Sequence, residues 1–121
     1  MARDINFNEP IRRGESITIT HTQYTEDTTV QSTTPEDITG WTLEFTVSEA
    51  KNSTTKLIGP KAMTLVTPAS GVATVAITAA ESNIDPGTYW CDVWRRDAGY
   101  ERCLAEGPCP IKGNARIPTS A

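Results

Sequence analysis

Alternation of apolar and polar residues is the strongest pattern in this chain, and it recurs in short segments along most of its length. Residues 16–20 alternate strictly, and residues 41–47 place four large apolar side chains on one face and polar ones on the other. A two-residue period is typical of a β-strand with one buried face. Turn residues separate the segments by roughly 8–12 residues, the spacing of a β-sandwich. We therefore predict an all-β sandwich of about seven strands, which lie within residues 16–20, 41–47, 57–58, 63–65, 72–77, 89–95 and 100–111.

A short connector helix is predicted between the strands at 72–77 and 89–95. Thr78 followed by Glu81 has the spacing of a capping box, in which each side chain bonds a backbone N–H group of the first helical turn. Asp85 and Pro86 end this turn almost at once, because the residue before a proline avoids helical geometry. The connector is therefore predicted to be a helix of one or two turns.

Residues 85–93 form the most specific motif of the chain. Asp85, Gly87 and Tyr89 resemble the corner that precedes strand F of an immunoglobulin-like sandwich, where a tyrosine hydroxyl bonds back to upstream backbone. We predict that Pro86 fixes the turn and that Gly87 ends it with a positive φ. The resemblance implies an immunoglobulin-like β-sandwich, in which these residues have a structural role.

Two further positions of this resemblance concern the core. Trp41 lies near the start of the strand at 41–47, where an immunoglobulin-like core places its buried tryptophan. The strand-B position of the partner cysteine is Ile17 or Ile19 here, so Cys91 has no partner in the other sheet. Together with the odd number of cysteines, three, this fits a reducing compartment.

A disulfide across the last hairpin is also not expected. A two-residue turn pairs Trp94 with Cys103 and puts Cys91 opposite Glu106, with the two sulfurs on opposite faces. A three-residue loop pairs Val93 with Cys103 and leaves Cys91 diagonal to it, at about 7–8 Å, whereas Cβ atoms in a disulfide lie about 3.8 Å apart. Either register predicts three free thiols, those of Cys91, Cys103 and Cys109.

Length and charge limit the function classes. The 121 residues suit one domain, for which we predict an N-terminal arm at 1–14, a sandwich at 15–112 and a C-terminal tail at 113–121. The formal net charge is −4, and acids dilute the basic start at residues 3–13, which is predicted to be a solvated face or a docking arm. Since nucleic acids and anionic membranes bind clustered Lys and Arg, neither partner is expected. No apolar run has the length of a signal-peptide core or a membrane span, so we expect folding in a cytoplasm.

No residue pattern for catalysis or for a cofactor is present. His21 could join the three cysteines at a metal, or act with one of them as a nucleophile pair, but the cysteine spacing lacks the close pairs of zinc sites. The acidic pairs at 26–27 and 36–37 lie in polar loops without an apolar pocket to raise a pKa. We predict no catalytic, metal or cofactor site, and a cross-strand ladder of ion pairs that joins Asp92 and Glu106 to Arg95, Arg96 and Arg102.

The alternation at 89–95 leaves two tryptophans to explain. If Tyr89 faces the core, Trp90 and Trp94 face outward. Large exposed aromatic residues mark contact sites, and Trp with Arg is the composition of interface hot spots. The alternative is that the polar segment 25–37 folds over the rings. The predicted interface residues are Trp90, Trp94, Arg95 and Arg102.

Four segments in a fixed order carry a second and more specific resemblance. They are residues 37–43, 71–75, 86–94 and 104–107. In this order they resemble the immunoglobulin-like domain of small tailed-bacteriophage virion proteins, similar to the N-terminal domain of the phage baseplate upper protein family. The resemblance covers roughly residues 10–112. It implies a non-enzymatic virion protein, assembled in the cytoplasm of a host bacterium.

The same resemblance implies the partners. In the baseplate family this domain attaches a longer receptor-binding or fibre-linking region to the particle, whereas the present chain ends after the domain. We expect an adaptor of the tail, the baseplate or the fibre attachment that is oligomeric in the particle and contacts other virion proteins. A capsid-decorating protein is the alternative in the same class. A carbohydrate-binding module is the alternative from another class, because aromatic platforms on sandwiches also stack on sugars.

Overall fold

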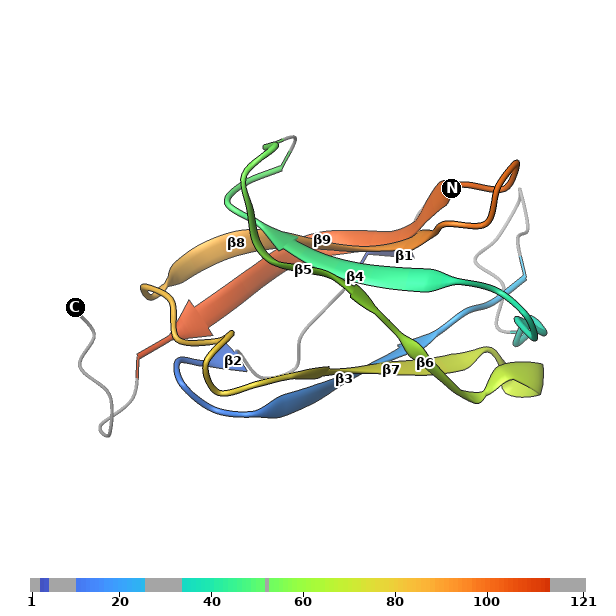
Figure 1. Ribbon diagram of the computed structural model, residues 1–121, viewed down its shortest axis with the longest axis horizontal. Helices are drawn as coiled ribbons and strands as arrows, with labels where there is room; N and C mark the ends of the chain where they lie inside the picture. Colours follow the sequence, from blue (N-terminus) through green and yellow to red (C-terminus); the bar gives the residue numbers. More distant parts are fainter. Residues whose placement is uncertain (1–2, 5–10, 26–33, 52, 114–121) are drawn as a thin grey trace.

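Two β-sheets pack face to face in the computed structural model of the chain (Figure 1). The structure describes residues 3–4, 11–25, 34–51 and 53–113. Among these residues, one sheet has six strands and the other has three. Each sheet turns its apolar residues toward the other sheet, as the alternating sequence requires.

The larger sheet has the strand order β1-β9-β8-β4-β5, and β2 also pairs with β9. β8 and β9 form an antiparallel hairpin, β4 lies antiparallel between β8 and β5, and both β1 and β2 run parallel to β9. The strands are β1 (Arg3–Asp4), β2 (Ile11–Arg12), β4 (Leu43–Ser48), β5 (Lys56–Ala62), β8 (Gly87–Arg95) and β9 (Arg102–Lys112).

The smaller sheet contains β3 (Ile17–Thr22), β7 (Val72–Ile77) and β6 (Thr64–Thr67), antiparallel in that order. The chain crosses from β5 in one sheet to β6 in the other at Met63 (Figure 1). One turn of 3-10 helix, η1 (Pro68–Ser70), joins β6 to β7. No helix among the described residues is long and apolar enough to cross a membrane.

This topology is that of an immunoglobulin-like β-sandwich. β9, β8 and β4 occupy the places of strands G, F and C, with β5 as the additional strand C′, while β3, β7 and β6 occupy those of strands B, E and D. The all-β immunoglobulin-like sandwich predicted from the sequence is therefore confirmed.

Apolar residues of both sheets fill the space between them. Phe45 of β4 is completely buried, and aliphatic side chains of 9% exposure or less surround it. Burial of each such side chain contributes about 1.5–3 kcal/mol. Trp41, which was predicted to be the buried core tryptophan, is instead half-buried in the loop before β4 and packs on the core from outside. Phe45 occupies the centre of the core because it lies within β4, whereas Trp41 lies in the loop before this strand.

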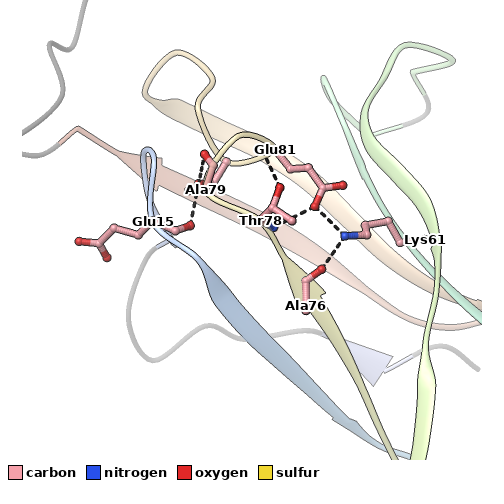
Figure 2. Close-up of polar contacts among 7 residues, drawn as sticks. Glu15, Lys61, Ala76, Thr78, Ala79 and Glu81 are labelled. Atoms are coloured by element: carbon pink, nitrogen blue, oxygen red, sulfur yellow. Dashed lines mark hydrogen bonds and ion pairs between the residues drawn. The ribbon is translucent and has the colours of Figure 1, made fainter.

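The predicted capping box at Thr78 and Glu81 is present (Figure 2). The Thr78 N–H donates to the Glu81 carboxylate at 2.8 Å, and the Glu81 N–H donates to the Thr78 hydroxyl at 3.1 Å. Lys61 of β5 reaches the same carboxylate at 2.6 Å and also donates to the Ala76 carbonyl. Residues 79–82 form a hydrogen-bonded turn rather than the predicted connector helix, because so short a segment does not offset the cost of helix nucleation.

Residues 11–14, which were assigned to an N-terminal arm, are part of the sandwich. Ile11 is 1% exposed and lies in β2, against β9. The backbone N–H of Arg13 donates to the Lys112 carbonyl at 2.6 Å, and the Arg13 side chain is buried. The predicted tail at 113–121 lies outside the described residues apart from Gly113.

The β8–β9 hairpin contains a β-bulge that neither predicted register includes. Trp94 pairs with Cys103, as a two-residue turn predicts. The next pair is Val93 with Ala105, so Leu104 is an extra residue in β9. Every pair beyond this point is shifted by one residue relative to the register of a two-residue turn. The residues on the outer face of β8 therefore have different partners in β9 from those predicted.

The three cysteines are free thiols in the structure. The shifted register places Cys91 opposite Gly107, whose carbonyl lies 3.5 Å from the Cys91 sulfur. Cys91 and Cys109 are both completely buried, and their thiols neighbour each other across β8 and β9. This contact and burial raise the pKa of Cys91, so it remains a protonated, apolar core residue.

Candidate interaction surface

The outer face of β8 carries both tryptophans that were predicted as interface residues. Cys91 and Val93 are 0% and 1% exposed in the core, so the alternate residues Trp90 and Trp94 point away from it. Both rings are half-buried. The predicted orientation is confirmed, and the role of the rings in an interface stays a prediction.

Two small polar residues of β4 share this outer face. Thr46 pairs with Asp92 and Ser48 pairs with Trp90, and directly paired residues point to the same side of a sheet. Thr46 and Ser48 are nevertheless only 6% exposed. Their side chains therefore lie beneath the surface of this face. The face is thus a continuous surface and not a pair of isolated rings.

Two carboxylates lie side by side between the tryptophans. Asp92 of β8 pairs directly with Glu106 of β9, which brings their Cβ atoms to about 4.5–5.5 Å. Burial raises the pKa of Asp92, and the Glu106 charge raises it further, while Lys56 and a hydrogen bond from Trp94 oppose this. The predicted ladder of ion pairs is therefore wrong at this position, where like charges face each other.

The arginines of the predicted ladder have other partners. Arg95 lies opposite Arg102, again a like charge, and its Nε donates to Asp97 Oδ2 at 2.9 Å. Arg96 pairs with Glu44 of β4 at 3.3 Å. Charges an odd number of residues apart on a strand face opposite sides of the sheet, which the ladder prediction overlooked.

Lys51, from the loop between β4 and β5, lies over one end of this surface. Its Nζ is 5.1 Å from the centroid of the Trp90 ring and 3.9 Å from Glu106 Oε1. The Lys51 side chain is 61% exposed. We call the surface the tryptophan face and define it by Trp90, Asp92, Trp94, Glu106 and Lys51.

Cys103 borders the tryptophan face, because it pairs with Trp94 across the hairpin. Its thiol donates to Glu106 Oε2 at 3.4 Å. Burial, followed by this carboxylate, raises the pKa of Cys103 to about 12. Cys103 is therefore a neutral thiol in the ordinary pH range.

Arg95 and Arg102 lie at the rim of the core and not on the tryptophan face. The Arg95 guanidinium is 3.9 Å from the centroid of Trp41 and 4.7 Å from that of Tyr100, and Arg102 is 5.9 Å from Trp41. This cluster lies where the loop before β4 meets the β8–β9 hairpin, because the Thr42 N–H donates to Asp97 Oδ2 at 2.9 Å. The four predicted interface residues thus form two groups: Trp90 with Trp94, and Arg95 with Arg102.

The tyrosine corner is formed as predicted. The Tyr89 hydroxyl donates to the Asp85 carbonyl oxygen at 2.5 Å. Burial raises the pKa of Tyr89, and the Asp85 charge adds to this effect. Gly87, however, lacks the predicted positive φ, because it is already the first extended residue of β8. The corner therefore needs the tyrosine and not the backbone freedom of this glycine.

A hollow of about 450 Å³ lies beside the corner and is lined by Arg13. The Arg13 Nε donates to Asn83 Oδ1 at 2.9 Å, and a terminal nitrogen lies 3.8 Å from Asp85 Oδ1. The Arg13 side chain is 7% exposed, whereas that of Asp85 is 74% exposed. These contacts hold the end of β2 against the turn between the sheets, so Arg13 has a structural role. Other residues lining the hollow are Glu49, Leu57, Ile84 and Tyr89.

The candidate catalytic and metal-binding residues do not come together. Within the described ranges, no group of three or more His, Cys, Asp or Glu side chains is placed to hold a metal ion. His21 is buried in the smaller sheet, and its Nε2 lies 3.0 Å from Gln23 Oε1. Asp37 accepts hydrogen bonds from Thr39, which lower its pKa, and the acidic pair at 26–27 lies outside the described residues.

The segment that was considered as a cover for the tryptophans is described only at its ends. Residues 26–33 lie outside the described ranges. Tyr24, just after β3, forms an isolated bridge with Pro35, and the Glu36 N–H donates to the Gln23 carbonyl at 3.0 Å. These ends therefore lie beside the smaller sheet.

Sequence reasoning missed Lys51 and the stacking of Arg95 on Trp41. The orientation of Arg95 could have been predicted from the sequence, because residues 91, 93 and 95 point to the same face of β8 and Cys91 and Val93 are buried. Lys51 gave no signal, since it lies in a polar turn that is distant in the sequence from the ring it contacts.

Comparison with known proteins identifies no family. No protein-family profile matches the chain, and no curated protein sequence matches it. Seven chains of solved structures match in three dimensions. One is the NK cell receptor Nkp44, a triggering partner in natural cytotoxicity, at 13% sequence identity and a TM-score of 0.46. That match covers 94% of this chain and 99% of the receptor chain.

Proposed function

We propose that the chain is a non-enzymatic structural protein of a tailed bacteriophage particle and that it binds a neighbouring virion protein through the tryptophan face. The observation that carries this proposal is the position of Trp90 and Trp94 on the outer face of a sheet whose core is filled by other residues. Tryptophan is enriched at the energetic centres of protein interfaces. The phage context comes from the sequence resemblance over roughly residues 10–112.

An adaptor of the tail, the baseplate or the fibre attachment is the leading assignment, and a capsid-decorating protein is the alternative. Both roles need a rigid domain with one docking face. The resemblance to the N-terminal domain of the baseplate upper protein family favours the first. Labelling the protein in purified particles and locating the label by electron microscopy distinguishes a position on the tail from one on the head.

The charged side chains between the two rings argue against the carbohydrate-binding alternative. Sugars stack on open aromatic faces. The paired residues Asp92 and Glu106 lie between the two ring positions, and the Lys51 Nζ is 5.1 Å from the Trp90 centroid. Contact with a polar protein surface suits these rings better than the stacking of a sugar.

The test replaces Trp90→Ala and Trp94→Ala together in the phage that encodes the chain. We expect the purified variant to fold, with a melting transition close to that of the wild type, and to be absent from particles when its copy number is measured by mass spectrometry. The matched control is Leu57→Ala with Val66→Ala, which removes exposed apolar side chains on β5 and β6 and is expected to leave incorporation unchanged. Normal incorporation of the tryptophan variant, or unfolding of the isolated domain, would overturn the proposal.

A further inference from the structure

We propose that the tryptophan face binds a basic segment of its partner, with an arginine side chain seated against Asp92 and Glu106 between the two rings. This inference rests on the proposed function and names the chemistry of the partner. It is carried by three observations: the opposed carboxylates, the position of Lys51, and a stack of the same composition elsewhere in the chain.

The opposed carboxylates define the centre of the surface. Asp92 pairs directly with Glu106, and Trp90 and Trp94 lie two residues to either side of Asp92 on the same face. A rise of about 3.3 Å per residue puts each ring position about 7 Å along the strand from the acidic pair. A cation between the two carboxylates therefore contacts both charges and an aromatic ring at once. Each contact favours a cation, the first through charge-assisted hydrogen bonds and the second through the ring quadrupole.

Lys51 shows that this surface accepts a cation. Its ammonium group lies at one edge, 3.9 Å from Glu106 and 5.1 Å from the Trp90 centroid. The distance to Glu106 is long for a charge-assisted hydrogen bond, and the side chain is 61% exposed. An ammonium group held this loosely is displaced easily, so a better-placed guanidinium from a partner replaces Lys51 with little cost.

A cation, an aromatic ring and a carboxylate also come together at the rim of the core, at shorter distances. There the Arg95 guanidinium stacks 3.9 Å from the Trp41 centroid, while its Nε bonds Asp97 at 2.9 Å. A planar guanidinium satisfies an aromatic face and a carboxylate together, which a lysine ammonium does less well. This stack supports arginine as the preferred side chain on the tryptophan face.

Charge complementarity extends beyond the pair itself. The formal net charge of the chain is −4, so a basic segment is attracted from a distance as well as on contact. Lys56 and Lys51 are the cations that act on Asp92 and Glu106 from neighbouring segments. The proposal therefore requires the partner's cation to compete with Lys51.

The experiment titrates the full-length protein with hexa-arginine, hexa-lysine and hexa-glutamate as probes. The tryptophan indole N–H signals are followed by NMR and assigned with single Trp→Phe variants. We expect hexa-arginine to move the Trp90 and Trp94 signals, to leave Trp41 unmoved, and to bind more tightly than hexa-lysine. Hexa-glutamate should move none of them.

Three variants make the test specific. Asp92→Asn with Glu106→Gln removes the opposed charges, which relieves repulsion and leaves the fold intact, and it should weaken hexa-arginine binding about tenfold. Lys51→Ala removes the competing cation and should strengthen binding several-fold. Glu15→Gln changes an exposed acid elsewhere and serves as the matched control, with affinity unchanged.

Each outcome bears on one proposal. Equal binding by the Asp92/Glu106 variant, shifts at Trp41 instead of Trp90 and Trp94, or a preference for hexa-glutamate would overturn the arginine site. If the arginine site holds but the tryptophan variant still enters particles, the proposed docking role fails alone. If incorporation is lost while hexa-arginine binding ignores Asp92 and Glu106, docking stands and the arginine site fails.

Discussion

The Tyr89 hydroxyl donates to the carbonyl oxygen of Asp85, four residues earlier in the chain, at 2.5 Å. This bond joins the start of β8 to the turn that arrives from the smaller sheet. Because side chains alternate along β8, fixing Tyr89 toward the core also fixes Trp90 and Trp94 toward solvent. The corner and the tryptophan face are thus two consequences of one register.

We predict that Tyr89→Phe lowers the free energy of unfolding by about 1 kcal/mol, the contribution of one such hydrogen bond. The ring stays in place, so packing is preserved. Urea denaturation measures the difference, with Tyr100→Phe as the control because Tyr100 is 64% exposed. Equal stability of the wild type and the Tyr89 variant would show that the corner hydrogen bond is dispensable.

Three glycine-to-alanine variants should form a graded series. Gly71 has φ +75°, and an added Cβ would collide with the Gln23 carbonyl and lie 2.8 Å from that of Glu36, so a loss of about 3 kcal/mol is expected. Gly40 has φ +84° with no atom within 4 Å and should lose about 1 kcal/mol from backbone strain alone. Gly87 lacks a positive φ, and its variant should be within about 0.5 kcal/mol of the wild type. Thermal or urea melts measure the order, and a Gly87 variant as unstable as the Gly71 variant would contradict it.

Period-2 alternation predicted the fold because it depends only on which residues can face a core. The positions of the longer strands in the described residues and the outward orientation of Trp90 and Trp94 follow from it, whereas the tyrosine corner was predicted from the motif at residues 85–89. The contribution of the N-terminal segment could not be predicted in this way. A two-residue strand such as β2 has no period, and Ile11 is buried only because β9 lies beside it.

The cross-strand neighbours on the tryptophan face could not be predicted from the sequence. The bulge at Leu104 shifts the register and brings Asp92 opposite Glu106, and no local residue pattern announces it. Lys51 reaches Trp90 from a separate loop. Contacts between distant segments depend on how the strands are aligned with one another. The alternation of apolar and polar residues does not determine this alignment where a bulge adds one residue.

The link between Lys61 and Glu81 should stabilise the protein in a pH-dependent way. The Lys61 contact, and after it the Thr78 N–H, lower the pKa of Glu81. A carboxyl group with a lowered folded-state pKa stabilises the fold above its unfolded-state pKa, and this contribution is lost as pH falls through the folded-state value. The stability difference between wild type and Glu81→Gln should therefore shrink between about pH 6 and about pH 3. Urea melts across this range measure it, and a difference that grows with acid would contradict the assignment.

The capping box itself can be tested at neutral pH. Thr78→Ala removes the hydroxyl that accepts a hydrogen bond from the Glu81 N–H and should cost about 1 kcal/mol, as the loss of an equivalent cap does at the start of a helix. Thr18→Ala is the control, because Thr18 is exposed on β3. A loss no larger than that of the control would mean that the Thr78 hydroxyl does not stabilise the turn.

The reactivity of Cys103 should depend on Glu106. The Glu106 carboxylate accepts the Cys103 thiol hydrogen bond at 3.4 Å and, after burial, contributes to raising the pKa of Cys103 to about 12. Only the thiolate reacts with a disulfide reagent, so labelling of the native protein at about pH 8 should be slow. Glu106→Gln removes a charge that repels the thiolate, which lowers the pKa of Cys103 and speeds labelling at the same pH.

The count of reactive thiols provides the control for this measurement. In denaturant without reductant, three cysteines should be labelled in the wild type and in Glu106→Gln, because Cys91, Cys103 and Cys109 are free. In the native state Cys91 and Cys109, both 0% exposed, should stay unlabelled on the time scale on which Cys103 reacts. A count of one in denaturant would reveal a disulfide and overturn the free-thiol assignment. An unchanged native labelling rate in Glu106→Gln would instead leave the thiol count intact and show that burial alone sets the pKa of Cys103.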